Sequence, residues 1–121
     1  MNELLGSRPR IADLTLRAIA AFAVDWFGQT DFLTIDAQYQ KEGVCGTTAL
    51  TYDPADSIAS VWFGAAIQTI PDRVNAASPL RYIATAKVIP PFAIAHGDAD
   101  CEVPVDQSRE LNDALTKAGV P

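Results

Sequence analysis

Two short apolar blocks along the chain predict strands. Residues 92–95, Phe-Ala-Ile-Ala, carry no polar side chain at either parity, which favours a strand buried on both faces of a parallel sheet. A second apolar run fills positions 18–24, and we expect a buried strand from about Ile19 to Trp26. Its alanines would also permit a helix. However, the run ends at Gly28, and β-branched and aromatic residues gather near its end, so we prefer a strand.

Helix-start signals and helical spacing predict the elements between and after these strands. Asp53-Pro54 begins a helix, because Asp accepts from free backbone N–H groups and Pro at the first helical position gives up no hydrogen bond. In that helix Ile58, Val61 and Trp62 fall at i, i+3 and i+4, so we expect them to form its buried face. A short helix follows over residues 69–77, started by Pro71-Asp72.

The last element predicted is a helix over residues 106–118. It opens with an Asp and stops at Gly119, and its apolar positions form one stripe: Leu111, Ala114, Leu115 and Ala118. By contrast, residues 37–52 are polar and contain two glycines, which indicates a loop or the remnant of a lid. The pattern as a whole predicts an α/β fold, with about two parallel strands flanked by four helices of varying length.

Composition and charge narrow the class of protein. Half of the 121 residues are hydrophobic, far above the range of disordered chains. The net charge of −6 and the scattered positions of the nine Lys and Arg residues argue against a nucleic-acid partner. No apolar run approaches the roughly 18 residues of a membrane helix, and the amino terminus does not look like a signal peptide. We therefore expect no membrane span and a cytoplasmic location.

The two cysteines, Cys45 and Cys101, lie far apart in no metal-binding spacing. We interpret them as free thiols in loops. The alternative is a disulfide that links the middle loop to the loop after residues 92–95, which would imply an oxidising compartment.

Candidate chemistry concentrates in residues 96–104, His-Gly-Asp-Ala-Asp-Cys-Glu-Val-Pro, which directly follow the strand predicted at 92–95. Sites in open α/β sheets form at this carboxyl end of the strands. Together with Gln107-Ser108, the segment resembles the H-G-x-x-D-x-x-V-P loop of α/β-hydrolase esterases and lipases, the carboxylesterase group related to prolyl oligopeptidases. Residues 24–32, Val-Asp-Trp-Phe-Gly-Gln-Thr-Asp-Phe, and 77–83, Ala-Ser-Pro-Leu-Arg-Tyr-Ile, are similar to two further segments of that group, in the same order.

The resemblance implies a carboxylic-ester hydrolase in which Asp100 is the acid of a catalytic triad. That group carries its Ser on a Gly-x-Ser-x-Gly elbow and its catalytic His after the acid. Residues 1–121 contain no such elbow, and the one histidine, His96, precedes the acid. We therefore expect a single partial α/β-hydrolase domain over 1–121. It would match the carboxyl-terminal part of the esterase, with residues 3–5 as a remnant of the nucleophile helix, and would be inactive alone.

The resemblance also places Trp26, Phe27 and Asp31 in a loop that lines a pocket for the substrate, a small ester. The alternative is structural, with Asp31 capping a short helix that begins at residues 32–33 and Trp26 in the core. We expect His96 to be structural and bonded to a loop carbonyl. We expect no metal, because adjacent residues of one loop rarely converge on an ion, and no cofactor.

Two other functions remain open at the level of sequence. One is a small, self-sufficient esterase with an atypical Ser or Cys nucleophile, dependent on Asp100 or His96. The other is a non-catalytic interaction module, a homo-oligomer that pairs exposed sheet edges and so completes its fold by dimerisation.

Overall fold

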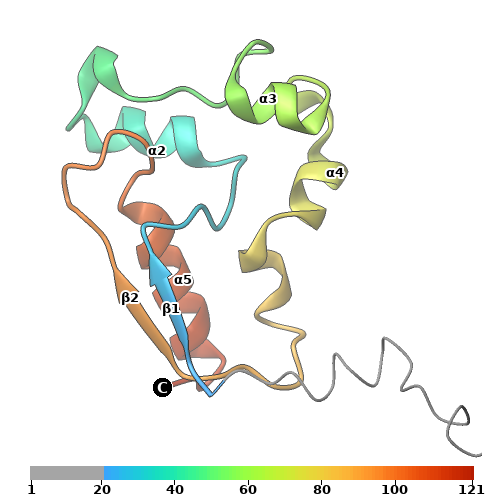
Figure 1. The fold of residues 1–121 in the computed structure, drawn as a ribbon, viewed down its shortest axis with the longest axis vertical. Helices are drawn as coiled ribbons and strands as arrows, with labels where there is room; N and C mark the ends of the chain where they lie inside the picture. Colours follow the sequence, from blue (N-terminus) through green and yellow to red (C-terminus); the bar gives the residue numbers. More distant parts are fainter. Residues whose placement is uncertain (1–20) are drawn as a thin grey trace, which may run out of the picture.

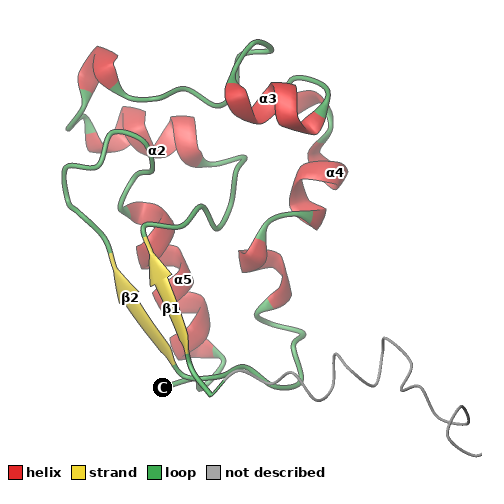
Figure 2. Cartoon of the chain, in the orientation of Figure 1, coloured by secondary structure: helices red, strands yellow, loops and turns green. Residues whose placement is uncertain are grey.

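The computed structural model describes residues 21–121, in which a two-stranded sheet, four α-helices and three short 3-10 turns follow one another (Figures 1 and 2). This content agrees with the predicted partial α/β fold. The predicted strand residue Ile19 and the segment 3–5 lie outside the described residues. Within residues 21–121 no helix is long and apolar enough to cross a membrane.

The sheet consists of β1 (Ala23–Trp26) and β2 (Phe92–Ala95), which run parallel with Ala23 opposite Phe92 and Trp26 opposite Ala95. Burial alternates along both strands, so the prediction of strands buried on both faces is wrong. One face points toward α5 (Asp106–Lys117), which lies along the sheet in Figure 1. Among residues 21–121 nothing packs on the other face, the open face of the sheet, where Trp26 is 70% exposed and Val24 is exposed as well.

The helix α5 confirms its predicted stripe. Leu111 and Leu115 are buried, and Ala114 is partly buried. Its first residue, Asp106, accepts hydrogen bonds from Arg109 and Lys41, and these cations hold the pKa of the Asp106 carboxyl below its usual value. After α5 the chain turns back toward β2, where the Phe92 N–H donates to the Pro121 carbonyl at 3.1 Å. The last residues of the chain thus lie beside the outer edge of β2.

The other helices, α2 (Ile35–Glu42), α3 (Ile58–Phe63) and α4 (Pro71–Ala76), correct two predictions. First, the segment expected to be a loop from residue 37 begins as helix α2. Second, α3 starts at Ser57, whose side chain accepts from the Ser60 N–H, and not at Asp53. The face of α3 expected to be buried is exposed: Ile58, Val61 and Trp62 point to solvent, while Ala59, Ser60 and Phe63 are buried.

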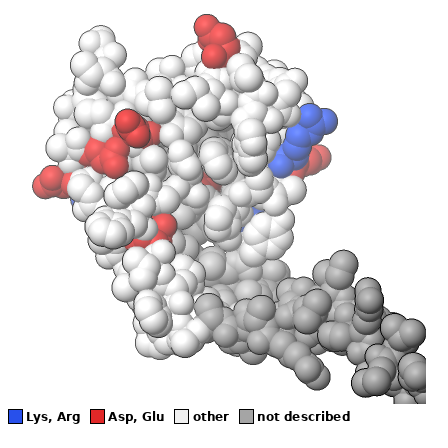
Figure 3. Space-filling model, viewed as in Figure 1, with Lys and Arg blue, Asp and Glu red and all other residues white. Residues whose placement is uncertain are grey.

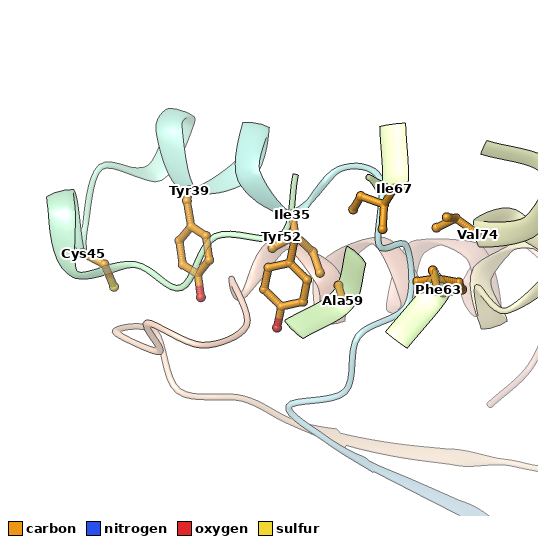
Figure 4. Close-up of a cluster of buried hydrophobic side chains, with 8 residues drawn as sticks. All are labelled: Ile35, Tyr39, Cys45, Tyr52, Ala59, Phe63, Ile67 and Val74. Carbon is orange, nitrogen blue, oxygen red and sulfur yellow. The ribbon is translucent and has the colours of Figure 1, made fainter. Parts of the chain in front are cut away.

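The hydrophobic core lies beyond the carboxyl ends of the strands and not on the sheet (Figure 4). It joins α2, the loop after it, α3 and the start of α4. Figure 4 shows the rings of Tyr39 and Tyr52 side by side below α2, with both hydroxyls directed to the loop between β2 and α5. Its buried members are Ile35, Tyr39, Cys45, Tyr52, Ala59, Phe63, Ile67 and Val74. The core therefore supports residues 96–104, where the sequence predicts the candidate catalytic chemistry.

Candidate functional site

Two loops meet at the carboxyl ends of the parallel strands. Residues 27–34 leave β1 and residues 96–105 leave β2, and the Phe27 N–H donates to the Ala95 carbonyl at 2.9 Å where they part. Phe27 has a φ of 49°, in the left-handed region that bulky residues rarely adopt. The chain therefore turns sharply at the point where both loops begin.

Asp100 holds the loop after β2 in a tight turn. Its Oδ1 accepts from the backbone N–H groups of Glu102, at 2.8 Å, and Val103, at 2.9 Å. The other oxygen, Oδ2, has no hydrogen bond to the described residues and lies 3.6 Å from His96 Nε2. With its side chain one-fifth exposed, Asp100 presents one fixed oxygen and one accessible oxygen.

His96 is buried, with its side chain 3% exposed, and both of its ring nitrogens are engaged. Nε2 donates to the Val103 carbonyl at 2.9 Å, which confirms the predicted bond to a loop carbonyl. Nδ1 lies 2.7 Å from the Ser108 hydroxyl, and that hydroxyl lies 3.3 Å from Asp25 Oδ2. Because Nε2 carries the donated proton, a neutral His96 accepts a hydrogen bond from the Ser108 hydroxyl at Nδ1. A charged His96 instead donates from Nδ1 to the Ser108 oxygen, and the Ser108 hydroxyl can then donate to Asp25.

The side chains of Ser108 and His96 have the spacing of a nucleophile and its base, but a substrate cannot reach the Ser108 hydroxyl. Ser108 is 5% exposed, and it sits in the first turn of α5 beneath the loop. A substrate carbonyl cannot reach a hydroxyl that is enclosed by His96 and Asp25. The arrangement ties β1, β2 and α5 together, and we assign it a structural role.

A disulfide between Cys45 and Cys101 fastens the Asp100 loop to the segment after α2. The prediction of free thiols is therefore wrong. The two cysteines are 56 positions apart, and no local motif indicates that they meet. Cys101 also accepts, through its carbonyl, from the Leu50 N–H at 2.8 Å. The loop that carries Asp100 is thus covalently attached to the helical part of the molecule.

Two buried tyrosines contact the same loop from the core. The Tyr52 hydroxyl donates to the Glu102 carbonyl at 2.8 Å and accepts from Gln29 Nε2 at 2.9 Å. The Tyr39 hydroxyl lies 3.4 Å from the Asp100 carbonyl. Burial raises the pKa of both phenols, and the nearby carboxylates add to this effect. Both hydroxyls therefore stay protonated and remain donors to the loop.

Gln107, completely buried, joins the two loops to each other. Its Oε1 accepts from the Thr30 N–H at 2.8 Å and the Asp31 N–H at 2.7 Å, and its Nε2 donates to Gln38 Oε1 at 2.7 Å. A single side-chain amide thus accepts hydrogen bonds from two backbone N–H groups where the chain passes from β1 to α2. The sequence offers no signal for this role except the position of Gln107 in the first turn of a predicted helix.

The structure places the three residues predicted to line a pocket in two different settings. Trp26 and Phe27 are exposed at the end of β1, with ring centroids 6.2 Å apart. Asp31 is buried and bonds to the Arg81 guanidinium at 2.5 Å. Its Oδ1 also accepts from the Leu33 N–H at 3.2 Å, which caps the turn before α2. Asp31 therefore has the structural partners of a capping residue, while the two rings face solvent.

Asp25 and Gly28, which both belong to the segment 24–32 that resembles the esterase group, also shape the site. A Cβ at Gly28 would collide with Asp25 Oδ1, so a larger residue there would displace the Asp25 carboxylate that faces Ser108. Among residues 21–121, no three His, Cys, Asp or Glu side chains are grouped to hold a metal ion.

Comparison with known proteins adds one match. The family model named BD-FAE matches residues 13–115, which covers most of the chain. No curated protein matches the chain.

Proposed function

The chain belongs to the BD-FAE family of α/β-hydrolase-like esterase domains, and from this premise we propose that Asp100 is the acid of a Ser-His-Asp triad that hydrolyses a small carboxylic ester. In such a triad the acid accepts the Nδ1–H of the catalytic imidazole, fixes its tautomer and stabilises the imidazolium. Esterase-type hydrolysis is what the family suggests; the role of Asp100 is our inference.

The observation that carries this proposal is the unequal use of the two Asp100 oxygens. Backbone N–H groups fix Oδ1, so the carboxylate cannot rotate freely. Oδ2 is left for a further donor, and the neighbouring His96 already donates to the Val103 carbonyl. An imidazole that approaches from solvent would find an oriented acceptor, which is what a triad acid requires.

We propose that the nucleophile and the base come from polypeptide outside residues 1–121, because these residues contain no Gly-x-Ser-x-Gly elbow and no histidine after Asp100. The chain alone would then be inactive. Trp26 and Phe27 remain our candidates for contact with the ester, because they are exposed at the strand end. Asp31 would support that loop from beneath through Arg81.

Assays on the chain alone and on a completed chain test this proposal. Purified chain should neither hydrolyse p-nitrophenyl acetate nor react with a fluorophosphonate probe. A chimera that adds the elbow and histidine segments of a BD-FAE esterase should hydrolyse the ester. In that chimera Asp100→Asn should lower kcat by about 10³ to 10⁴. Asp98→Asn, an exposed carboxylate of the same loop, is the matched control and should change kcat little.

Two results would contradict the proposal. Turnover by the chain alone that survives Asp100→Asn would show that another residue supplies the acid. Equal losses from Asp100→Asn and Asp98→Asn in the chimera would show that Asp100 has no special role.

The open face of the sheet supports a second candidate, a homo-oligomeric interaction module. Phe22, Val24, Trp26 and Phe27 are exposed together on and beside β1. Apolar surfaces of this kind are often interaction sites. Sedimentation equilibrium of the purified chain would test it. A dimer dissociated by Trp26→Lys would support this function, and a monomer at all concentrations would exclude it.

The disulfide bears on where the protein works. From the sequence we predict a cytoplasmic location. The bond between Cys45 and Cys101 favours an oxidising compartment instead, because cytosolic thiols are kept reduced. Alkylation of thiols before and after reduction, on protein taken from its own cell, decides between the two.

A further inference from the structure

A cavity of about 380 Å³ lies between the Asp100 loop and the exposed side of α3. Its volume falls in the roughly 300 to 1,000 Å³ range of small-molecule sites. The residues that matter for its chemistry are Gln29, Phe32, Tyr52, Trp62, Glu102 and Val103. Nothing in the proposed role of Asp100 uses this cavity.

Three aromatic side chains line the cavity, each from a different segment. Trp62 is 70% exposed, and its ring is held by Phe63, with ring centroids 4.6 Å apart. The ring centroids of Phe32 and Trp62 are 6.4 Å apart. Tyr52 is only 5% exposed, and its hydroxyl is bonded to Gln29 and Glu102, so it forms part of the cavity wall, whereas Trp62 and Phe32 offer more of their ring surface to a ligand.

The charge at the cavity is negative. Glu102 is exposed and forms no salt bridge with the described residues. None of the described Lys and Arg residues lines the cavity. On the face drawn in Figure 3, several acidic groups lie on the side of the β2–α5 loop, and others lie at the top of the view and beside the prominent basic group on the opposite side. An anionic ligand would therefore be repelled and a cationic one attracted.

We propose that this cavity binds an organic cation with an alkylated ammonium group, of the size of choline. Aromatic faces attract a quaternary ammonium through their quadrupole, and a nearby carboxylate supplies the counter-charge. The same aromatic surface would hold an uncharged group of the same shape less tightly. The inference goes beyond ester hydrolysis and stands whether or not Asp100 is a triad acid.

The test is a titration of the ¹⁵N-labelled chain followed by the indole N–H signals of its two tryptophans. Choline chloride is the probe, 3,3-dimethyl-1-butanol is its uncharged isostere, and sodium chloride controls for ionic strength. Choline should shift the Trp62 signal in a saturable way and leave that of Trp26, on the open face of the sheet, unchanged. Its affinity should exceed that of the alcohol by about three- to tenfold.

Two variants locate the interaction. Glu102→Gln keeps the size of an exposed side chain but removes the counter-charge, so it should weaken choline binding by about two- to fivefold and leave the affinity for the alcohol unchanged. Trp62→Leu should weaken choline binding, with Tyr82→Leu, an exposed aromatic residue outside the cavity, as the matched control that leaves it intact. Equal affinities for choline and the alcohol would overturn the proposal, and so would a Trp62 signal that follows only ionic strength. Binding that survives Glu102→Gln unchanged would also overturn it.

Discussion

Removal of the Cys45–Cys101 disulfide should cost a large part of the stability of this small domain. The bond closes a loop of 57 residues, since its cysteines are 56 positions apart. In the chain-entropy account a closed loop of this length restricts the unfolded chain by about 4 kcal/mol at 25 °C. Domains have total stabilities of about 5 to 15 kcal/mol, so the double variant Cys45→Ser/Cys101→Ser should be close to unfolding.

Urea unfolding followed by circular dichroism measures this loss. With a slope of about 1 to 3 kcal/mol per molar urea, the midpoint should fall by about 1.5 to 4 M. Wild-type chain in excess reductant should follow the same curve as the double variant, which controls for the serine side chains. A shift equivalent to less than about 1 kcal/mol would refute the reasoning, because it would mean that the closed loop does not limit the unfolded state.

Three further predictions concern buried polar groups and a helix cap. Burial raises the pKa of the Glu110 carboxyl in the folded chain. The stabilisation that its protonated form provides is therefore fully present below the pKa of the unfolded chain, about 4, and it is lost as the pH rises through the pKa of the folded chain. Glu110→Gln should thus be more stable than wild type at pH 7 but not at pH 3 in thermal melts. Gln107→Leu leaves two buried backbone N–H groups without an acceptor and should cost about 2 to 5 kcal/mol in urea unfolding, whereas an unchanged midpoint would contradict its bridging role. Ser57→Ala removes the cap of α3 and should cost about 1 kcal/mol by the same measurement, with Ser60 amide exchange accelerated; unaltered exchange would speak against the cap.

The sequence predicted elements whose signals are local. Residues 92–95 form a strand, and the long helix near the carboxyl terminus has its expected stripe, because an apolar run and helical spacing are properties of the segment itself. Helix α2 was missed because it is polar on most of its surface, and only two of its apolar residues, Ile35 and Tyr39, are buried. The bond from His96 to a loop carbonyl is confirmed, and the catalytic role of Asp100 remains a prediction.

What the sequence could not predict depends on contacts between distant residues. The apolar residues of α3 suggested a buried face, yet the helix packs by Ala59 and Phe63, because Phe63 meets Phe32 in the core. The strands were expected to be covered on both faces, but α5 covers only one. The disulfide and the Gln107 hydrogen bonds join segments more than 50 positions apart. The periodicity of hydrophobic residues within a segment gives no information on such distant pairs.

The wide separation in sequence between β1 and β2 has a consequence for the synthesis of the protein. Ala23 pairs with Phe92, which is 69 positions later in the chain. At synthesis rates of about 5 to 20 residues per second, β1 waits roughly 3 to 14 seconds on the ribosome before its partner strand exists. During that time Val24 and Trp26, which stay exposed even in the folded chain, have no covering surface. Until β2 has been made, the edge of β1 that pairs with it has no hydrogen-bonding partner strand.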